Sequence, residues 1–414
     1  MIIDENALQL LSHAINFCNS IKLYGYIYDL NQNDYIEFSD FQIQNLAFTI
    51  DWNSKIELYR ELDDCPEELC STVNVKDFLA LYSHINDYEL VKNSIVYGKN
   101  MALFLVTGVD YYTIFRLMQD PIDTWCRSTI EVNNEEYVVE FISKRQAILD
   151  LLLWKEKKCD YESSVAIDDY FIKVTSTNNL NKKIAEDLAE SVIFELNTSH
   201  KITLAHEARI FDEDFDSYNL VQDTSEQMRK MFPLLIGKGI PELLKLYNKA
   251  MEVNDVDYKI LTFTKIIEYI APTVIRKNLN KRVFQKLSSP TALSPNAEYV
   301  QELQKIFDEN NLKYQKDSEM IKATILEIVD SDEIESKLPK FLKTDKKQDV
   351  LSTLSKAIAN TRNHIAHAKS NYEAKDLECP EAEKQQFTDI LKIVARQCIR
   401  WFNNTSEKDR ITNR

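Results

Sequence analysis

Two histidines, an arginine and an asparagine lie together in one short segment of this chain of 414 residues. Residues 361–368 read TRNHIAHA, so Arg362 precedes Asn363 and His364, and His367 follows three positions later. An imidazole can give or take a proton near neutral pH. A guanidinium can hold a phosphate oxygen and balance the charge that grows on it. These groups suit the cleavage of RNA, in which the ribose 2′-OH is the nucleophile, so the chemistry needs neither a metal ion nor a protein nucleophile.

The spacing of these residues has consequences on a helix, and the apolar pattern predicts a helix over residues 347–369. Asn363 and His367 are four residues apart and share a face. Arg362 and His367 are five apart, so their Cβ directions differ by roughly 140°, a gap that a long arginine can bridge. One motif supplies one histidine in the useful direction. Two copies across a two-fold axis would supply an acid and a base, so the chemistry favours a homodimer.

Arg362, Asn363 and His367 match the pattern R-N-x-x-x-H, which resembles the motif of the HEPN domain family. The flanks, LSKAIANT before the motif and CIRWF at 398–402 after Cys379-Pro380, are similar to the Apea-like HEPN domains of prokaryotic defence proteins. The resemblance covers about residues 215–405. It implies a helical, dimeric domain that acts without cofactors as a metal-independent endoribonuclease, in anti-phage defence or as a toxin.

The resemblance also implies roles for individual residues. Arg362 would bind phosphate, Asn363 would orient a group, and His367 would act as acid or base. Glu268 matches the acidic residue that many family members carry on an earlier helix. Apart from the resemblance, we expect His364 to lie on the helix surface or at a dimer contact, where it could support the site. Some HEPN domains keep the fold without catalysis. A non-catalytic RNA-binding or protein-binding module is therefore the alternative function.

Other interpretations of these residue types stay open. Arg362 and His367 could be a helix cap and a structural histidine. His364 and His367 could share a metal ion, but no nearby carboxylate or third ligand is evident from the spacing, so we expect no metal site. The seven cysteines form no CxxC pair, which favours reduced thiols in a cytoplasmic protein.

Residues 273–289 contain five basic residues and no acidic one. Such a stretch could hold an RNA backbone, or it could be a solvated helix face. The RNA-binding interpretation names Arg276, Lys277, Lys281, Arg282 and Lys286.

The pattern of apolar residues predicts an α+β fold, with a mixed α+β region over residues 1–212 followed by an all-α HEPN-like helical bundle over 213–414. In the first region we expect helices at 4–19 and 144–154, a hairpin turning at Asn133-Asn134, and strands. The expected strand segments are 21–28, 45–50, 55–59, 94–107, 128–142 and 167–175. The helices expected in the second region are 221–232, 240–252, 256–270, 273–288, 296–310, 317–330, 347–369 and 381–403.

Charge separates the same two regions. The net charge is −16, but residues 1–200 hold 16 basic and 33 acidic residues, whereas residues 201–414 hold 34 and 33. We expect the acidic region to be a sensor or regulatory domain, on which an activating or inhibiting ligand acts and which keeps bulk RNA away. No apolar run approaches the ~20 residues of a membrane helix, and the first ten residues lack the basic residues of a signal peptide, so we expect a cytoplasmic location without a membrane partner.

Overall fold

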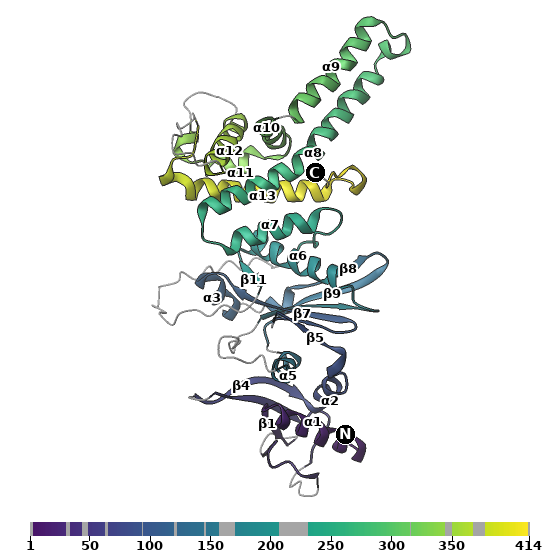
Figure 1. The fold of residues 1–414 in the computed structure, drawn as a ribbon, viewed down its shortest axis with the longest axis vertical. Coiled ribbons are helices and arrows are strands. Elements are labelled where there is room, and N and C mark those ends of the chain that lie inside the picture. Colours follow the sequence, from purple (N-terminus) through teal and green to yellow (C-terminus); the bar gives the residue numbers. More distant parts are fainter. Residues whose placement is uncertain are drawn as a thin grey trace. The chain divides into compact units, whose positions relative to one another are not determined.

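The fold is described by a computed structural model in which contacts divide the chain into two units, Met1–Leu234 and Leu235–Arg414 (Figure 1). The described residues are 3–29, 34–43, 49–62, 65–92, 94–119, 122–144, 146–156, 170–206, 231–314, 316–343, 350–366 and 377–412. The expected boundary after residue 212 and most of the expected helix 221–232 lie outside them. The expected fold class is confirmed: the first unit contains antiparallel sheets and helices, and the second is helical.

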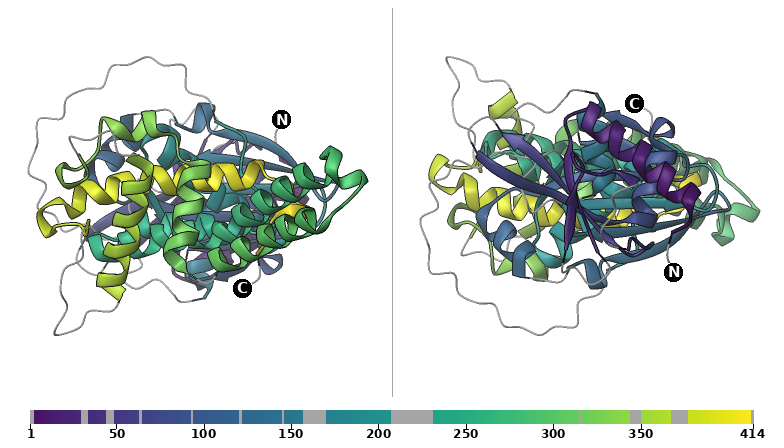
Figure 2. Two further views of the ribbon diagram at one scale, coloured as in Figure 1. Left: turned by 90° about the horizontal axis from the view of Figure 1, so that it is seen from above. Right: turned by 90° about the horizontal axis from the view of Figure 1, so that it is seen from below.

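A four-stranded antiparallel sheet opens the first unit. In sheet order its strands are β2 (Tyr35–Glu37), β1 (Tyr24–Tyr28), β3 (Lys55–Leu62) and β4 (Cys65–Asn74). Side chains alternate across the strands, so Ile27, Ile56 and Leu58 are buried on one face. Helix α1 (Glu5–Ser20) buries its apolar side in the same core. Figure 2 shows this helix and the strands from below. Helix α2 (Val75–Ser83) follows β4 directly.

The opposite face of this sheet is rich in tyrosine. The hydroxyl groups of Tyr28 and Tyr59 each donate to Oε2 of Glu57 at 2.7 Å, and Lys55 forms an ion pair with the same carboxylate. Burial alone would raise the pKa of Glu57, but these hydrogen bonds outweigh it and lower the pKa. Glu57 is therefore a charged centre that ties β1 to β3.

A seven-stranded antiparallel sheet completes the first unit. Its strands, in sheet order, are β5 (Glu89–Val91), β6 (Ile95–Tyr97), β7 (Met101–Gly108), β10 (Tyr170–Ser176), β9 (Glu135–Ile142) and β8 (Arg127–Val132), with β11 (Leu204–His206) also paired to β7. The expected hairpin is confirmed: Asn133 and Asn134 have φ of 55° and 63°, as a type I′ turn requires. The helices of this part are α3 (Tyr111–Gln119), α4 (Ile122–Trp125), α5 (Ala147–Lys155) and α6 (Lys182–His200).

The second unit is built around one long helix, α8 (Val256–Leu287), which contacts α7, α9, α10, α12 and α13. The other helices are α7 (Ile240–Glu252), α9 (Ala297–Tyr314), α10 (Asp317–Ile328), α11 (Ser331–Glu335), α12 (Val350–Ala366) and α13 (Lys384–Asn404). The expected interruption of α8 at Pro272 is wrong. Proline cannot donate to the carbonyl of Glu268, but residues 270–275 are buried on all sides, and this packing keeps the helix continuous.

A clasp formed by Lys238, Glu407 and Arg410 joins the two ends of the helical unit. The buried guanidinium of Arg410 donates to the carbonyls of Asn403, Thr405 and Lys238 at 2.6, 2.9 and 3.1 Å. In return, Lys238 donates through Nζ to the carbonyl of Arg410 at 3.1 Å and through its backbone N–H to Glu407 at 2.9 Å. The clasp fixes the segment after α13 against the segment before α7.

Candidate active site

The motif lies at the end of α12, and the burial of this helix explains its placement. Leu354, Ala357, Ile358 and Thr361 are fully buried at helical spacing. This face packs against α10 and α8. The residues that follow Thr361 therefore leave the core at the last described turn of the helix.

Arg362 is the centre of the polar contacts at this helix end. Its Nε lies 3.2 Å from Oε1 of Glu268 on α8, and its Nη1 donates to Oδ1 of Asn363 at 3.0 Å. Both charged side chains are largely buried, with exposed fractions of 24% for Arg362 and 13% for Glu268. The structure thus brings together three of the residues expected at the site, from two helices.

Asp317 is a fourth residue at the site, and the sequence pattern did not indicate it. It is the first residue of α10, and its Oδ2 lies 3.8 Å from Nη2 of Arg362. The carboxylate is about half exposed. Arg362 therefore faces one buried and one exposed carboxylate, and its positive charge is balanced in this conformation.

His364 points to a different partner. Its Nδ1 contacts Oε1 of Glu378, whose side chain is only 8% exposed. The adjacent residue is anchored too, since the backbone N–H of Cys379 donates to Oγ1 of buried Thr361 at 2.9 Å. These two contacts tie the segment at 378–379 to the motif helix. Spacing could not reveal Glu378, because a segment of chain separates it from His364.

His367, the expected acid or base, lies outside the described residues, which resume at Leu377. It comes directly after Ala366, the last described residue of α12. Its position relative to Arg362 stays a prediction.

The five basic residues that were expected to bind RNA all lie on α8, where they differ in their contacts. Arg282 pairs with Glu309 of α9 at 2.7 Å, and Lys286 pairs with Glu302 of the same helix. Lys277 lies with its Nζ 4.8 Å from the ring centroid of Trp401. Arg276 and Lys281 are exposed. Two of the five charges therefore serve the contact between α8 and α9, which favours the structural interpretation for Arg282 and Lys286.

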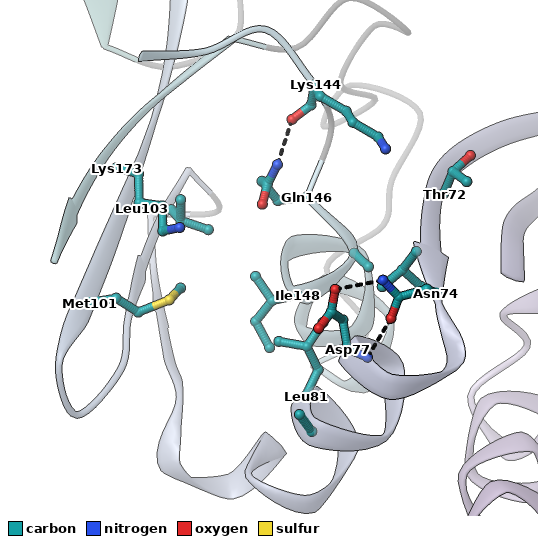
Figure 3. Close-up of a pocket in the computed structure, with 13 residues that line it drawn as sticks. Thr72, Asn74, Asp77, Leu81, Met101, Leu103, Lys144, Gln146, Ile148 and Lys173 are labelled. Atoms are coloured by element: carbon teal, nitrogen blue, oxygen red, sulfur yellow. Dashed lines mark hydrogen bonds between the residues drawn. The ribbon is translucent and has the colours of Figure 1, made fainter. Parts of the chain in front are cut away.

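The first unit contains a cavity of about 390 Å³ in which polar and apolar side chains meet (Figure 3). Met101, Leu103 and Ile148 give it an apolar wall, Lys144 contributes positive charge, and Lys173 is paired with Glu140 at 3.1 Å. Across from them, Asn74 holds Asp77 through a hydrogen bond of 2.9 Å. Its volume lies within the range of sites for small organic ligands.

The described residues offer neither a reactive cysteine thiolate nor a group of side chains that could hold a metal ion. Burial raises the pKa of Cys18, Cys126, Cys379 and Cys398 to about 12 in each case, so these thiols stay protonated at neutral pH. Within the described ranges, no three His, Cys, Asp or Glu side chains are grouped to hold a metal ion.

No protein-family model matches the chain, and no curated protein or solved structure is significantly similar to it. Of the helices that the structure describes, none combines the length and apolar character required to cross a membrane. The functional proposal therefore depends on the residues of the site.

Proposed function

We propose that this chain is a metal-independent endoribonuclease of the HEPN type, acting as a homodimer in anti-phage defence or as a toxin. The observation that carries the proposal is the position of Arg362, which lies beside Asn363 and Glu268 in the last described turn of the motif helix. His367 follows Arg362 by five residues in the sequence. The residue types, their spacing and the resemblance of the motif all support the same chemistry.

The reaction would use the 2′-OH of the substrate as nucleophile. One His367 would accept the proton of that hydroxyl, and His367 of the second copy would protonate the 5′-oxygen as it leaves. Arg362 would hold a non-bridging phosphate oxygen and stabilise the charge that develops on it. Glu268 would act as a positioning residue, because its carboxylate fixes Nε of Arg362, and Nη2, which faces exposed Asp317, would be the nitrogen atom that reaches the substrate. Unpaired RNA would be preferred, since in-line attack needs a flexible backbone.

A non-catalytic RNA-binding or protein-binding module is the second candidate. The contacts of Arg362 with both Glu268 and Asp317 favour a module that does not cleave, because a guanidinium that faces two carboxylates is less able to stabilise the charge that develops during cleavage. A nuclease without bound RNA would have the same contacts, and the substrate would then displace exposed Asp317 from Arg362.

An RNA-cleavage assay in excess EDTA, comparing the wild type with His367→Ala, separates the two functions. Cleavage by the wild type and loss of cleavage with RNA binding retained in the variant would support the nuclease. RNA binding without cleavage by either protein would support the module and contradict the nuclease. Arg362→Lys serves as a further variant, because it keeps the charge but loses the planar guanidinium.

The acidic first unit would regulate this activity through a small ligand. The cavity beside Met101, Leu103 and Lys144 would hold a ligand with an apolar body and a negative group that faces Lys144. The test compares cleavage by the full chain with cleavage by residues 235–414, after circular dichroism has established that the shorter chain folds. Equal rates would contradict a regulatory role for the first unit.

A further inference from the structure

Another cavity of the first unit is lined by polar side chains, and the proposed function makes no use of it. Its volume of about 600 Å³ lies within the ~300–1,000 Å³ of small-ligand sites. It shares no residue with the cavity of Figure 3. The described residues of its lining include three asparagines, Asn100, Asn178 and Asn179, but no Ala, Val, Leu, Ile or Met. The cavity therefore suits a ligand that forms hydrogen bonds rather than an apolar one.

Backbone hydrogen bonds hold the asparagines in place. They lie in two connections of the chain, one from β6 to β7 and one from β10 to α6. The N–H of Ser176 donates to the carbonyl of Asn100 at 2.9 Å, and the N–H of Leu180 donates to the carbonyl of Lys99 at 2.8 Å. These bonds lie on either side of residues 177–179 and tie the two connections together. The three amide groups are exposed and have no hydrogen-bond partner within the described ranges, so they are available to a ligand.

Tyr88 supplies an aromatic wall of the cavity. It lies between the short helix η2 (Ile85–Asp87) and β5. Its ring packs directly on Gly98: a Cβ atom at that glycine would lie only 2.6 Å from Cε1 of the ring. The ring is therefore fixed by the backbone on which it lies, and a ligand can pack against it without first ordering it.

The charges that line the cavity are nearly balanced. Oδ2 of Asp87 lies 3.0 Å from Nδ1 of His84, and Lys99 adds one positive charge. Residues 1–200 hold 33 acidic and 16 basic residues, so the field of this region would repel an anionic ligand. The single carboxylate already contacts an imidazole, so it offers little to a cation. A neutral ligand fits these charges best.

A carbohydrate meets these requirements. Its hydroxyl groups both donate and accept hydrogen bonds, and so does the amide of an asparagine. Its ring also presents C–H groups that can pack on an aromatic side chain. A neutral nucleoside fits less well, because a base has two flat faces to cover and the described lining offers one large aromatic ring.

We propose that this cavity binds a neutral mono- or disaccharide, with its hydroxyl groups on Asn100, Asn178 and Asn179 and its ring against Tyr88. The proposal concerns the first unit alone and holds whether or not the chain cleaves RNA.

Saturation-transfer NMR on the full chain tests the proposal. The probes are D-glucose, D-galactose, D-mannose, N-acetyl-D-glucosamine, maltose and lactose, and adenosine represents the competing class. We expect transfer of saturation to at least one saccharide and none to adenosine. Transfer to no saccharide would overturn the proposal, and transfer to adenosine alone would assign the cavity to nucleosides instead.

Substitutions in the cavity locate the bound saccharide. The double variant Asn178→Ala with Asn179→Ala should bind it about tenfold more weakly, because the hydrogen bonds of two amides are lost. Tyr88→Leu should also weaken binding, whereas Tyr88→Phe keeps the ring and should bind as the wild type does. The matched control is Asn254→Ala, which removes an exposed amide of the second unit and should change nothing. Thermal unfolding followed by circular dichroism establishes that each variant is folded. Unchanged binding by the folded double variant would overturn this site.

Discussion

Arg362 and Glu268 form an ion pair between α12 and α8, with 3.2 Å between Nε and Oε1. Glu268 lies in the buried middle of α8, four residues before Pro272, so the helix that carries it is held rigidly. The carboxylate can therefore fix the direction of the guanidinium, and this gives the pair a measurable role.

Replacing Arg362 by alanine should lower the rate of RNA cleavage by about 10²–10³-fold, because the negative charge of the transition state loses its preorganised donor. Glu268→Gln should lower the rate less and change the single-turnover rate more than RNA binding, as expected of a positioning residue. Single-turnover cleavage and fluorescence anisotropy measure the two quantities. Exposed Glu319 on α10 is the control site, and Glu319→Gln should behave as the wild type. Full activity of Arg362→Ala would contradict the proposed site.

Asp317→Asn should strengthen RNA binding. The exposed carboxylate lies 3.8 Å from Nη2 of Arg362, so its removal leaves more positive charge for a phosphate. Exposed pairs are worth about 0.2–1 kcal/mol, which corresponds to at most about a fivefold gain in affinity. The gain should shrink at high salt. Binding that weakens in the variant would mean that Asp317 supports the site instead.

Thr361→Val should destabilise the helical unit by about 1–3 kcal/mol. The substitution keeps the shape of the buried side chain but leaves the N–H of Cys379 without its acceptor. Urea unfolding followed by circular dichroism gives the change in the free energy of unfolding. Thr361→Ser, which retains the hydroxyl, is the matched control and should lose less. Equal losses would assign the effect to packing rather than to the hydrogen bond.

The charge of Glu57 should make the first unit sensitive to acid. Hydrogen bonds and ion pairing lower the pKa of this carboxyl in the folded state, so its stabilising effect is complete above the ordinary pKa of a glutamate. That effect is lost as the pH falls through the lowered pKa of the folded state. Thermal unfolding between pH 7 and pH 3 should show a shallower loss of stability in Glu57→Gln than in the wild type. Glu37→Gln, at an exposed position of β2, should keep the slope of the wild type.

Arg410→Met should destabilise the helical unit by about 2–4 kcal/mol. The three backbone carbonyl groups that accept hydrogen bonds from the guanidinium would all lose their donor. Arg410→Lys should recover only part of this loss, since an ammonium group cannot reproduce the planar fork. Chemical unfolding of the three proteins measures the difference. If lysine restores the full stability, charge rather than geometry holds the clasp.

Helices with one apolar face could be predicted from the sequence, and α7 has the expected bounds, 240–252. The sequence pattern did not predict helix α6. Residues 188–197 of this helix are all buried, including Glu190 and Glu195, so the segment lacks the exposed polar face by which an amphipathic helix is identified. At the site, Glu268 was predicted through the resemblance and lies beside Arg362. Asp317 and Glu378 were not, because tertiary packing brings them close from other segments. The expected role of His367 stays a prediction.

The clasp of Lys238 and Arg410 has a consequence for protein engineering. Its hydrogen bonds run from the side chain of each residue to the backbone carbonyl of the other, so the entry and exit of the helical unit lie within the reach of one side chain. A unit of this geometry can be inserted into a loop of a host protein without stretching the host backbone. We therefore expect residues 235–412 to fold when they are inserted into another protein. A segment that ends before Arg410 would lose the hydrogen bonds of the clasp and should be less stable.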